Sequence, residues 1–183
     1  MKKILALFTV LIIGVMSVFA YSYPRWKTMP IRVYIPEKGQ FSQLAHKAFN
    51  AWQEKSNNVV RFKYVNKISE ADIYVSFVKR VNCGSESAVG CTHYGVIRNG
   101  FFTQNKVEIG IYELIYNSDG SVYGKKPVTR PKNNLYGVMI HEIGHALGFE
   151  HSENKNSIMY PIDRNEIQYI TKTDLNILSK KYR

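Results

Sequence analysis

The stretch that most constrains this chain runs from His141 to His151 and reads HEIGHALGFEH. Residues four apart on a helix lie about 40° apart around its axis, so His141 and His145 can place both imidazoles on one metal ion. Glu142 stands beside that pair, where its carboxylate can exchange a proton with a metal-activated water. If the chain turns sharply at Gly148, His151 can supply a third ligand. Three histidines with an open fourth position favour a catalytic zinc site, because structural zinc sites normally have four protein ligands.

The same stretch predicts how its helix is anchored. Apolar residues on the side opposite the histidines can pack into a core; they are Met139, Ile143, Ala146 and Leu147. Asn133 or Asn134 can cap the start of this helix. Glycines at 137, 144 and 148 form a third stripe, which indicates close approach of neighbouring groups or, at Gly148, the end of the helix.

The rest of the chain has the pattern of a mixed protein. Alternating apolar and polar residues predict strands near 31–35, 59–65, 71–78 and 107–111. Helical spacing of apolar residues predicts a helix over 41–52, and a last helix is expected over 171–181. Residues 117–134 are rich in Asn, Gly, Lys and Pro and are expected to form a long surface connection. This order predicts an α+β fold with a sheet packed against helices.

The N-terminus has the composition of an export signal. Lys2 and Lys3 precede an apolar run over residues 4–19, and Val18-Phe19-Ala20 at its end is a plausible cleavage point. We expect residues 1–20 to be a cleaved signal peptide, with an uncleaved membrane anchor as the alternative, and residues 21–183 to be one working domain. That domain would be secreted, periplasmic or extracellular, with no membrane contact after cleavage.

The net charge and the two cysteines indicate which partners and which covalent bond to expect. Loss of residues 1–20 removes two lysines and no acids, which lowers the formal charge from +11 to +9. The basic residues are scattered and form no nucleic-acid module, so no specific nucleic-acid partner is expected. Cys83 and Cys91 are close in sequence and, outside the cytoplasm, are expected to form a disulfide. A metal role for these cysteines with His93 lacks a fourth ligand.

The quoted residues resemble a known family. The stretch 141–151 matches the long metzincin motif, and SIMYP at 157–161 looks like the Met-turn, with Met159 beneath the zinc ligands. Ser152, directly after the third histidine, resembles the matrixins, the matrix metalloproteinase family. ADIYVSF at 71–77 and ITKTDLNILSKKY at 170–182 are similar to a matrixin strand and to the final matrixin helix.

The resemblance implies a metzincin-type α+β fold. Its mostly parallel five-stranded sheet has one antiparallel edge strand and packs with an active-site helix and a C-terminal helix. The substrate would lie extended along the edge strand, expected between Thr92 and Phe102. Pro161 and Ile162 correspond to the wall of the pocket that takes the side chain after the scissile bond.

Some residues depart from the family pattern. The short segment between the expected signal and the first strand has no cysteine, so no cysteine-switch propeptide is expected. His93 alone stands in the region of the animal family's second zinc, so we expect one catalytic Zn²⁺ and no second. Asp72 matches a position associated with calcium in some relatives, which makes Ca²⁺ a further candidate.

Together these features predict a secreted zinc metalloendopeptidase that acts on proteins or peptides. A zinc-activated water would hydrolyse the peptide bond, with Glu142 as the general base. The competing hypotheses are a cell-surface binding protein with this fold that holds zinc but has lost useful catalysis, and a basic module that binds cell-wall polymer.

Overall fold

The computed structural model describes residues 24–84, 88–127, 132–161 and 169–183. The expected signal peptide and Ile162 lie outside these residues. The strands are β1 (Ile31–Tyr34), β2 (Phe62–Tyr64), β3 (Ile73–Val78), β4 (Gly90–Tyr94), β5 (Ile97–Arg98), β6 (Phe101–Phe102), β7 (Asn105–Gly110), β8 (Tyr112–Tyr116) and β9 (Val122–Pro127). The helices are α1 (Gln40–Lys55), the 3₁₀ turn η1 (Ile68–Glu70), α2 (Lys132–Ala146) and α3 (Lys172–Tyr182).

The main sheet has five strands in the order β2-β1-β3-β7-β4. The pairs β1–β2, β1–β3 and β3–β7 are parallel, and β4 runs antiparallel to β7 at the edge. The expected α+β fold, with a mostly parallel five-stranded sheet and one antiparallel edge strand, is confirmed. The edge strand was expected between Thr92 and Phe102, but it spans Gly90–Tyr94, and the rest of that range carries the small β5–β6 pair.

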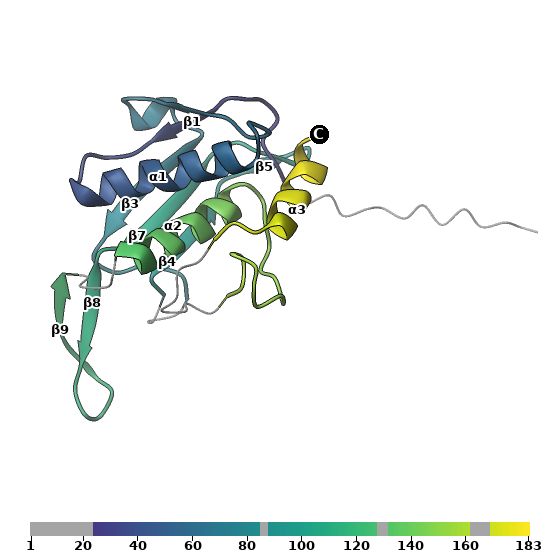
Figure 1. Cartoon of the computed structure of the whole chain (residues 1–183). Helices are drawn as coiled ribbons and strands as arrows, with labels where there is room; N and C mark the ends of the chain where they lie inside the picture. Colours follow the sequence, from purple (N-terminus) through teal and green to yellow (C-terminus); the bar gives the residue numbers. More distant parts are fainter. Residues whose placement is uncertain (1–23, 85–87, 128–131, 162–168) are drawn as a thin grey trace, which may run out of the picture.

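Helices α1 and α2 lie across one face of the sheet, and α3 packs beyond the end of α2 (Figure 1). The core lies between these layers, because alternate strand residues point toward the helices. Fully buried side chains include Ile31, Ile73 and Ile109 from the sheet and Trp52 and Met139 from the helices. Burial of each such side chain contributes about 1.5–3 kcal/mol, so this layer fixes the position of α2.

Residues 117–134 are not one long surface connection, so that expectation is wrong. Strands β8 and β9 form an antiparallel hairpin that projects from the body of the molecule (Figure 1). Asn117 N–H donates to Ser121 O (2.7 Å) and Gly120 N–H donates to Asn117 O (3.0 Å). The turn-forming residues thus close a hairpin between β8 and β9.

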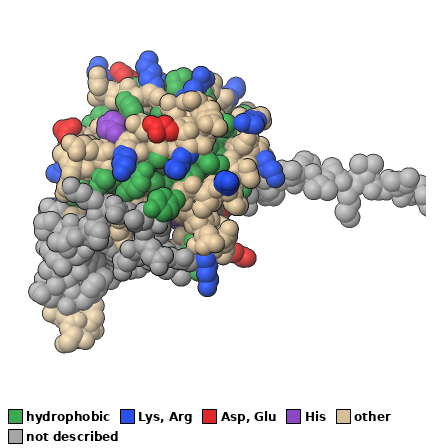
Figure 2. Space-filling view, in the orientation of Figure 1, with side chains coloured by type: hydrophobic (Ala, Val, Ile, Leu, Met, Phe, Trp, Pro, Cys, Tyr) green, Lys and Arg blue, Asp and Glu red, His purple; other side chains and the backbone are tan. Residues whose placement is uncertain are grey.

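Helix α3 begins where its sequence predicts. Thr171 caps the helix through a capping box with Asp174, whose carboxylate accepts from the Thr171 backbone N–H. Among the described residues, no helix is both long and apolar enough to span a membrane. On the face seen in Figure 2, lysine and arginine side chains are spread out, with acidic and hydrophobic side chains between them.

The disulfide Cys83–Cys91 ties the segment after β3 to the edge strand β4, with the two Cα atoms 5.8 Å apart. Cys91 lies on β4 and is buried, whereas Cys83 lies in the preceding exposed segment. The bond therefore holds the entry of β4 against the sheet.

Removal of this bond should destabilise the protein. Replacing Cys83 by serine and Cys91 by alanine is expected to lower the free energy of unfolding by about 2–3 kcal/mol, because the unfolded chain regains the freedom of a short closed loop. Urea unfolding of both proteins measures the difference. Equal unfolding free energies would show that the bond adds nothing to stability.

Candidate metal centre

Helix α2 and the turn after it bring three histidines together. One ring nitrogen from each of His141, His145 and His151 lies within 4.8 Å of the others. The Nε2 atoms of His141 and His145 are 3.1 Å apart, as expected for residues one helical turn apart. The His151 ring centroid lies 4.7 Å from that of His145 and 5.4 Å from that of His141. Within the described part of the chain, no other group of three or more histidine, cysteine or carboxylate side chains is close enough to hold one metal ion.

The hydrogen bonds of the first two histidines suit metal binding. His141 Nδ1 lies 2.7 Å from Ile158 O, and His145 Nδ1 lies 2.8 Å from Phe149 O. A carbonyl oxygen only accepts, so each Nδ1 carries the proton and each Nε2 keeps a free lone pair. Burial lowers the pKa of His141 to about 4 and also lowers the pKa of His145. Both rings are therefore neutral at pH 7, which is the form that binds zinc.

Gly148 ends the helix and turns the chain toward His151. Its φ is +89°, in the left-handed region that favours glycine. Phe149 N–H donates to Gly144 O (3.0 Å), which closes the helix end. A Cβ at position 148 would lie 2.1 Å from Pro24 O, so a side chain would clash as well as strain the backbone. Glycine is therefore required at position 148 by both conformation and space.

The carbonyl groups at the end of α2 are held by distant residues. Trp26 Nε1–H donates to Ala146 O (2.9 Å), and the same oxygen accepts from Asn105 Nδ2 (3.1 Å). Tyr182 O–H donates to Leu147 O (3.0 Å). Because these carbonyls have no partner within the helix, the three donors fix the end of α2 from which the histidines project.

Met159 lies against α2 beside the histidines. The residue is buried, and a Cβ at Gly144 would lie 2.4 Å from its Sδ atom. Ser152 N–H donates to Met159 O (2.9 Å), which joins the segment after His151 to the segment that carries Met159. The close approach of the thioether accounts for the glycine between His141 and His145.

Asp174 connects this centre to α3. Its buried carboxylate accepts from Ser157 Oγ (2.5 Å), from Ile158 N–H (3.3 Å) and from the hydroxyl of Thr171 (2.7 Å). Ile158 O is the acceptor for His141, so Asp174 supports the segment that orients this histidine. The sequence indicates Asp174 only as a helix-capping carboxylate, because its contact with Ser157 depends on the tertiary fold.

Removal of the Asp174 carboxylate should destabilise the folded protein. Asp174→Ala is expected to lower the free energy of unfolding by about 3 kcal/mol, because it removes a helix cap and leaves buried donors without acceptors. Urea unfolding measures this, with Asp119→Ala, which removes an exposed carboxylate, as the control. A loss no larger than that of the control would contradict the structural role.

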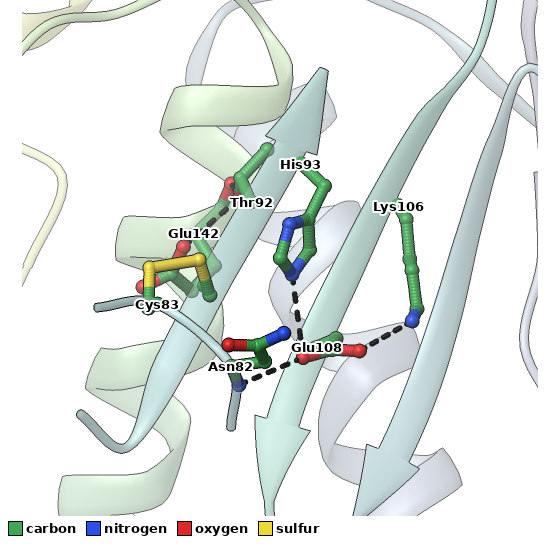
Figure 3. Close-up of polar contacts among 8 residues, drawn as sticks. Asn82, Cys83, Thr92, His93, Lys106, Glu108 and Glu142 are labelled. Atoms are coloured by element: carbon green, nitrogen blue, oxygen red, sulfur yellow. Dashed lines mark hydrogen bonds and ion pairs between the residues drawn. A yellow bond between two sulfur atoms is a disulfide. The ribbon is translucent and has the colours of Figure 1, made fainter. Parts of the chain in front are cut away.

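Glu142 projects from α2 toward the edge strand (Figure 3). Its side chain is buried, and burial raises its pKa to about 7, against the opposing effect of the Thr92 hydrogen bond. Thr92 Oγ lies 2.9 Å from Glu142 Oε2. Strand alternation alone could have indicated that Thr92 faces the helix, but its contact with Glu142 could not be predicted without the register of β4.

The remaining candidate residues are not part of the histidine cluster. Pro161 is exposed at the end of a described segment. Asp72 accepts hydrogen bonds from Arg32 on both carboxylate oxygens (3.0 and 2.6 Å). A role of Asp72 in calcium binding stays a prediction. His93 Nε2 lies 3.3 Å from the buried Glu108, on the side of β4 opposite Glu142 (Figure 3).

A family model and a curated relative show the family of this chain. The family model described as Matrixin matches residues 26–183. Macrophage metalloelastase of Rattus norvegicus is 28% identical over 146 residues, which cover 76% of this chain and 28% of that protein. Interstitial collagenase of Equus caballus is 31% identical over 150 residues, with 75% and 28% covered. The chain thus spans less than a third of the length of these curated relatives.

A solved structure shares the fold. The crystal structure of myroilysin aligns with a TM-score of 0.50 at 16% sequence identity, over 87% of this chain and 88% of that one. At this identity the similarity concerns the fold alone.

Proposed function

The chain belongs to the matrixin family, and we propose on that basis that it is a secreted zinc-dependent endopeptidase that acts on proteins or peptides. The observation that carries this proposal is the cluster of three histidine nitrogens within 4.8 Å of one another. The rings at 141 and 145 are held by backbone carbonyls that leave their Nε2 atoms free.

In this proposal His141, His145 and His151 hold one zinc ion. A zinc ion in a three-histidine site supplies Lewis-acid chemistry, because it polarises a carbonyl oxygen and lowers the pKa of water to about 7. Met159 packs behind the ligand helix and has no proton to exchange. Its role is to hold the geometry of the histidines.

Glu142 is the proposed general base and general acid. One of its carboxylate oxygens would take a proton from the attacking water and later deliver that proton to the amine nitrogen of the leaving product. The burial of the carboxylate against β4 supports this role, because few bulk waters can compete for the proton. Proton transfer then depends on the orientation that the surrounding residues give to this side chain.

Strand β4 is the proposed binding edge for the substrate. It pairs with β7 on one side, and its other side ends the sheet, where backbone groups can add an extended peptide as a further strand. Pro161 and Ile162 are the proposed wall of the pocket for the side chain after the scissile bond. The disulfide beside β4 suits an oxidising compartment, in line with export directed by residues 1–20 and a working domain of residues 21–183.

Cleavage of a mixed peptide library by the zinc-loaded protein tests the proposal, with new termini mapped by mass spectrometry. We expect cuts between internal residues, as an endopeptidase makes, and none in the same sample after treatment with a zinc chelator. One zinc per chain with no cut in the library or in protein substrates would favour the binding-protein hypothesis.

A further inference from the structure

Two residues of β4 face Glu142. Gly90 pairs with Ile109 of β7 and Thr92 pairs with Val107, both of which are buried in the core beneath the sheet. Because side chains alternate along a strand, Gly90 and Thr92 lie on the side of β4 that faces the helices. Figure 3 shows Thr92 above Glu142, with His93 directed to the other side. The edge strand thus places two neighbouring positions against one carboxylate.

Thr92 contacts Glu142 twice. Its hydroxyl oxygen lies 2.8 Å from the Glu142 backbone O and 2.9 Å from the carboxylate Oε2. The hydroxyl has one proton, which it can donate to either acceptor. A bond to the helix carbonyl alone would be a packing contact between strand and helix. The contact with Oε2 adds a donor to the group proposed to move the proton.

Gly90 limits where the same side chain can go. A Cβ at position 90 would lie 2.6 Å from Glu142 Cγ and 2.7 Å from Oε1. Glu142 Cγ and Oε1 therefore lie close against the backbone of β4, while Oε2 is held by the hydroxyl two residues further along. A glutamate side chain has three rotatable bonds, and these contacts select one of its conformations.

We propose that Thr92 is a positioning residue that, through its hydroxyl, holds the Glu142 carboxylate in the orientation needed for proton transfer. This inference rests on the proposed function of Glu142 as general base. In this inference β4 has two roles. The strand that would pair with the peptide substrate also orients the Glu142 carboxylate that would act on it. A small misplacement of such a group costs turnover more than substrate binding.

Three variants separate this role from a purely structural one. Thr92→Val keeps the shape and the β-branch but removes the hydroxyl, and Thr92→Ser restores a hydroxyl on a smaller side chain. Thr103→Val is the matched control, because Thr103 donates its hydroxyl to Val96 O (2.7 Å) at an exposed position. Zinc content, melting temperature, kcat and KM are measured for each protein.

We expect Thr92→Val to bind one zinc and to lose about tenfold in kcat, with KM changed by less than about twofold. Thr92→Ser should recover most of the lost kcat, and Thr103→Val should match wild type. Crystal structures give a readout independent of activity. Glu142 should have one side-chain conformation in wild type and in Thr92→Ser, and a displaced or mixed conformation in Thr92→Val.

Other results would overturn the inference. Wild-type kcat in Thr92→Val, or a change in KM alone, would exclude a role in orienting Glu142. Equal losses of zinc and melting temperature in Thr92→Val and Thr92→Ser would show that Thr92 only packs the strand against the helix. If wild type binds zinc and cleaves nothing, the proposed function is wrong, and this inference, which depends on that function, is wrong as well. If wild type cleaves and Thr92→Val cleaves equally well, the inference alone fails.

Discussion

Glu142→Gln protein is expected to bind zinc as wild type does and to lose about 10²–10⁴-fold in kcat. Glutamine has nearly the size of glutamate, and its amide oxygen can still accept from the Thr92 hydroxyl. It cannot take a proton from water or return one to the leaving amine. The variant therefore removes the proposed chemical role and preserves the packing against β4.

Steady-state cleavage of one peptide from the library measures this loss, with zinc per chain determined on the same preparations. Because burial of a neutral amide costs less than burial of a carboxylate, the variant should be at least as stable as wild type. Activity within about tenfold of wild type, with zinc bound, would show that Glu142 is not the general base.

His145→Ala is expected to remove both zinc and cleavage. Two remaining histidines leave a zinc ion with too few protein ligands, since catalytic zinc sites normally have three. The three rings form a compact triangle with centroid distances of 4.7, 4.7 and 5.4 Å, so the loss of His145 removes one of three equivalent corners of the cluster. Zinc analysis after gel filtration measures retention, and the library assay measures cleavage.

His46→Ala is the matched control for that variant. His46 lies on α1 with its ring against Tyr64, outside the histidine cluster. Its removal should leave zinc content and cleavage at wild-type values. One zinc per chain together with cleavage in His145→Ala would show that the metal is held elsewhere.

The centre of the site is largely predictable from local sequence. The spacing of His141 and His145 depends only on helical geometry, and apolar periodicity indicates which face of α2 is buried. Alternation predicts most strands of the main sheet, because each has one face in the core. These features could be predicted from the sequence because short-range spacing along the chain determines them.

Contacts between distant segments could not be predicted in the same way. The bond from Thr92 to Glu142 requires the register of β4 on β7, and the bond from Ser157 to Asp174 requires α3 to pack beside the Met159 segment. The β8–β9 hairpin was missed because its turn residues are also typical of unstructured loops. In each case the deciding information is which segments meet in space.

A zinc titration of the metal-free wild-type protein tests the central claim most directly. Zinc bound per chain and the rate of peptide cleavage are measured in the same samples as zinc is added. We predict that cleavage is absent without metal, rises in proportion to bound zinc and levels off at one zinc per chain. Cleavage that persists without metal, or that fails to appear with one zinc bound, would contradict the account.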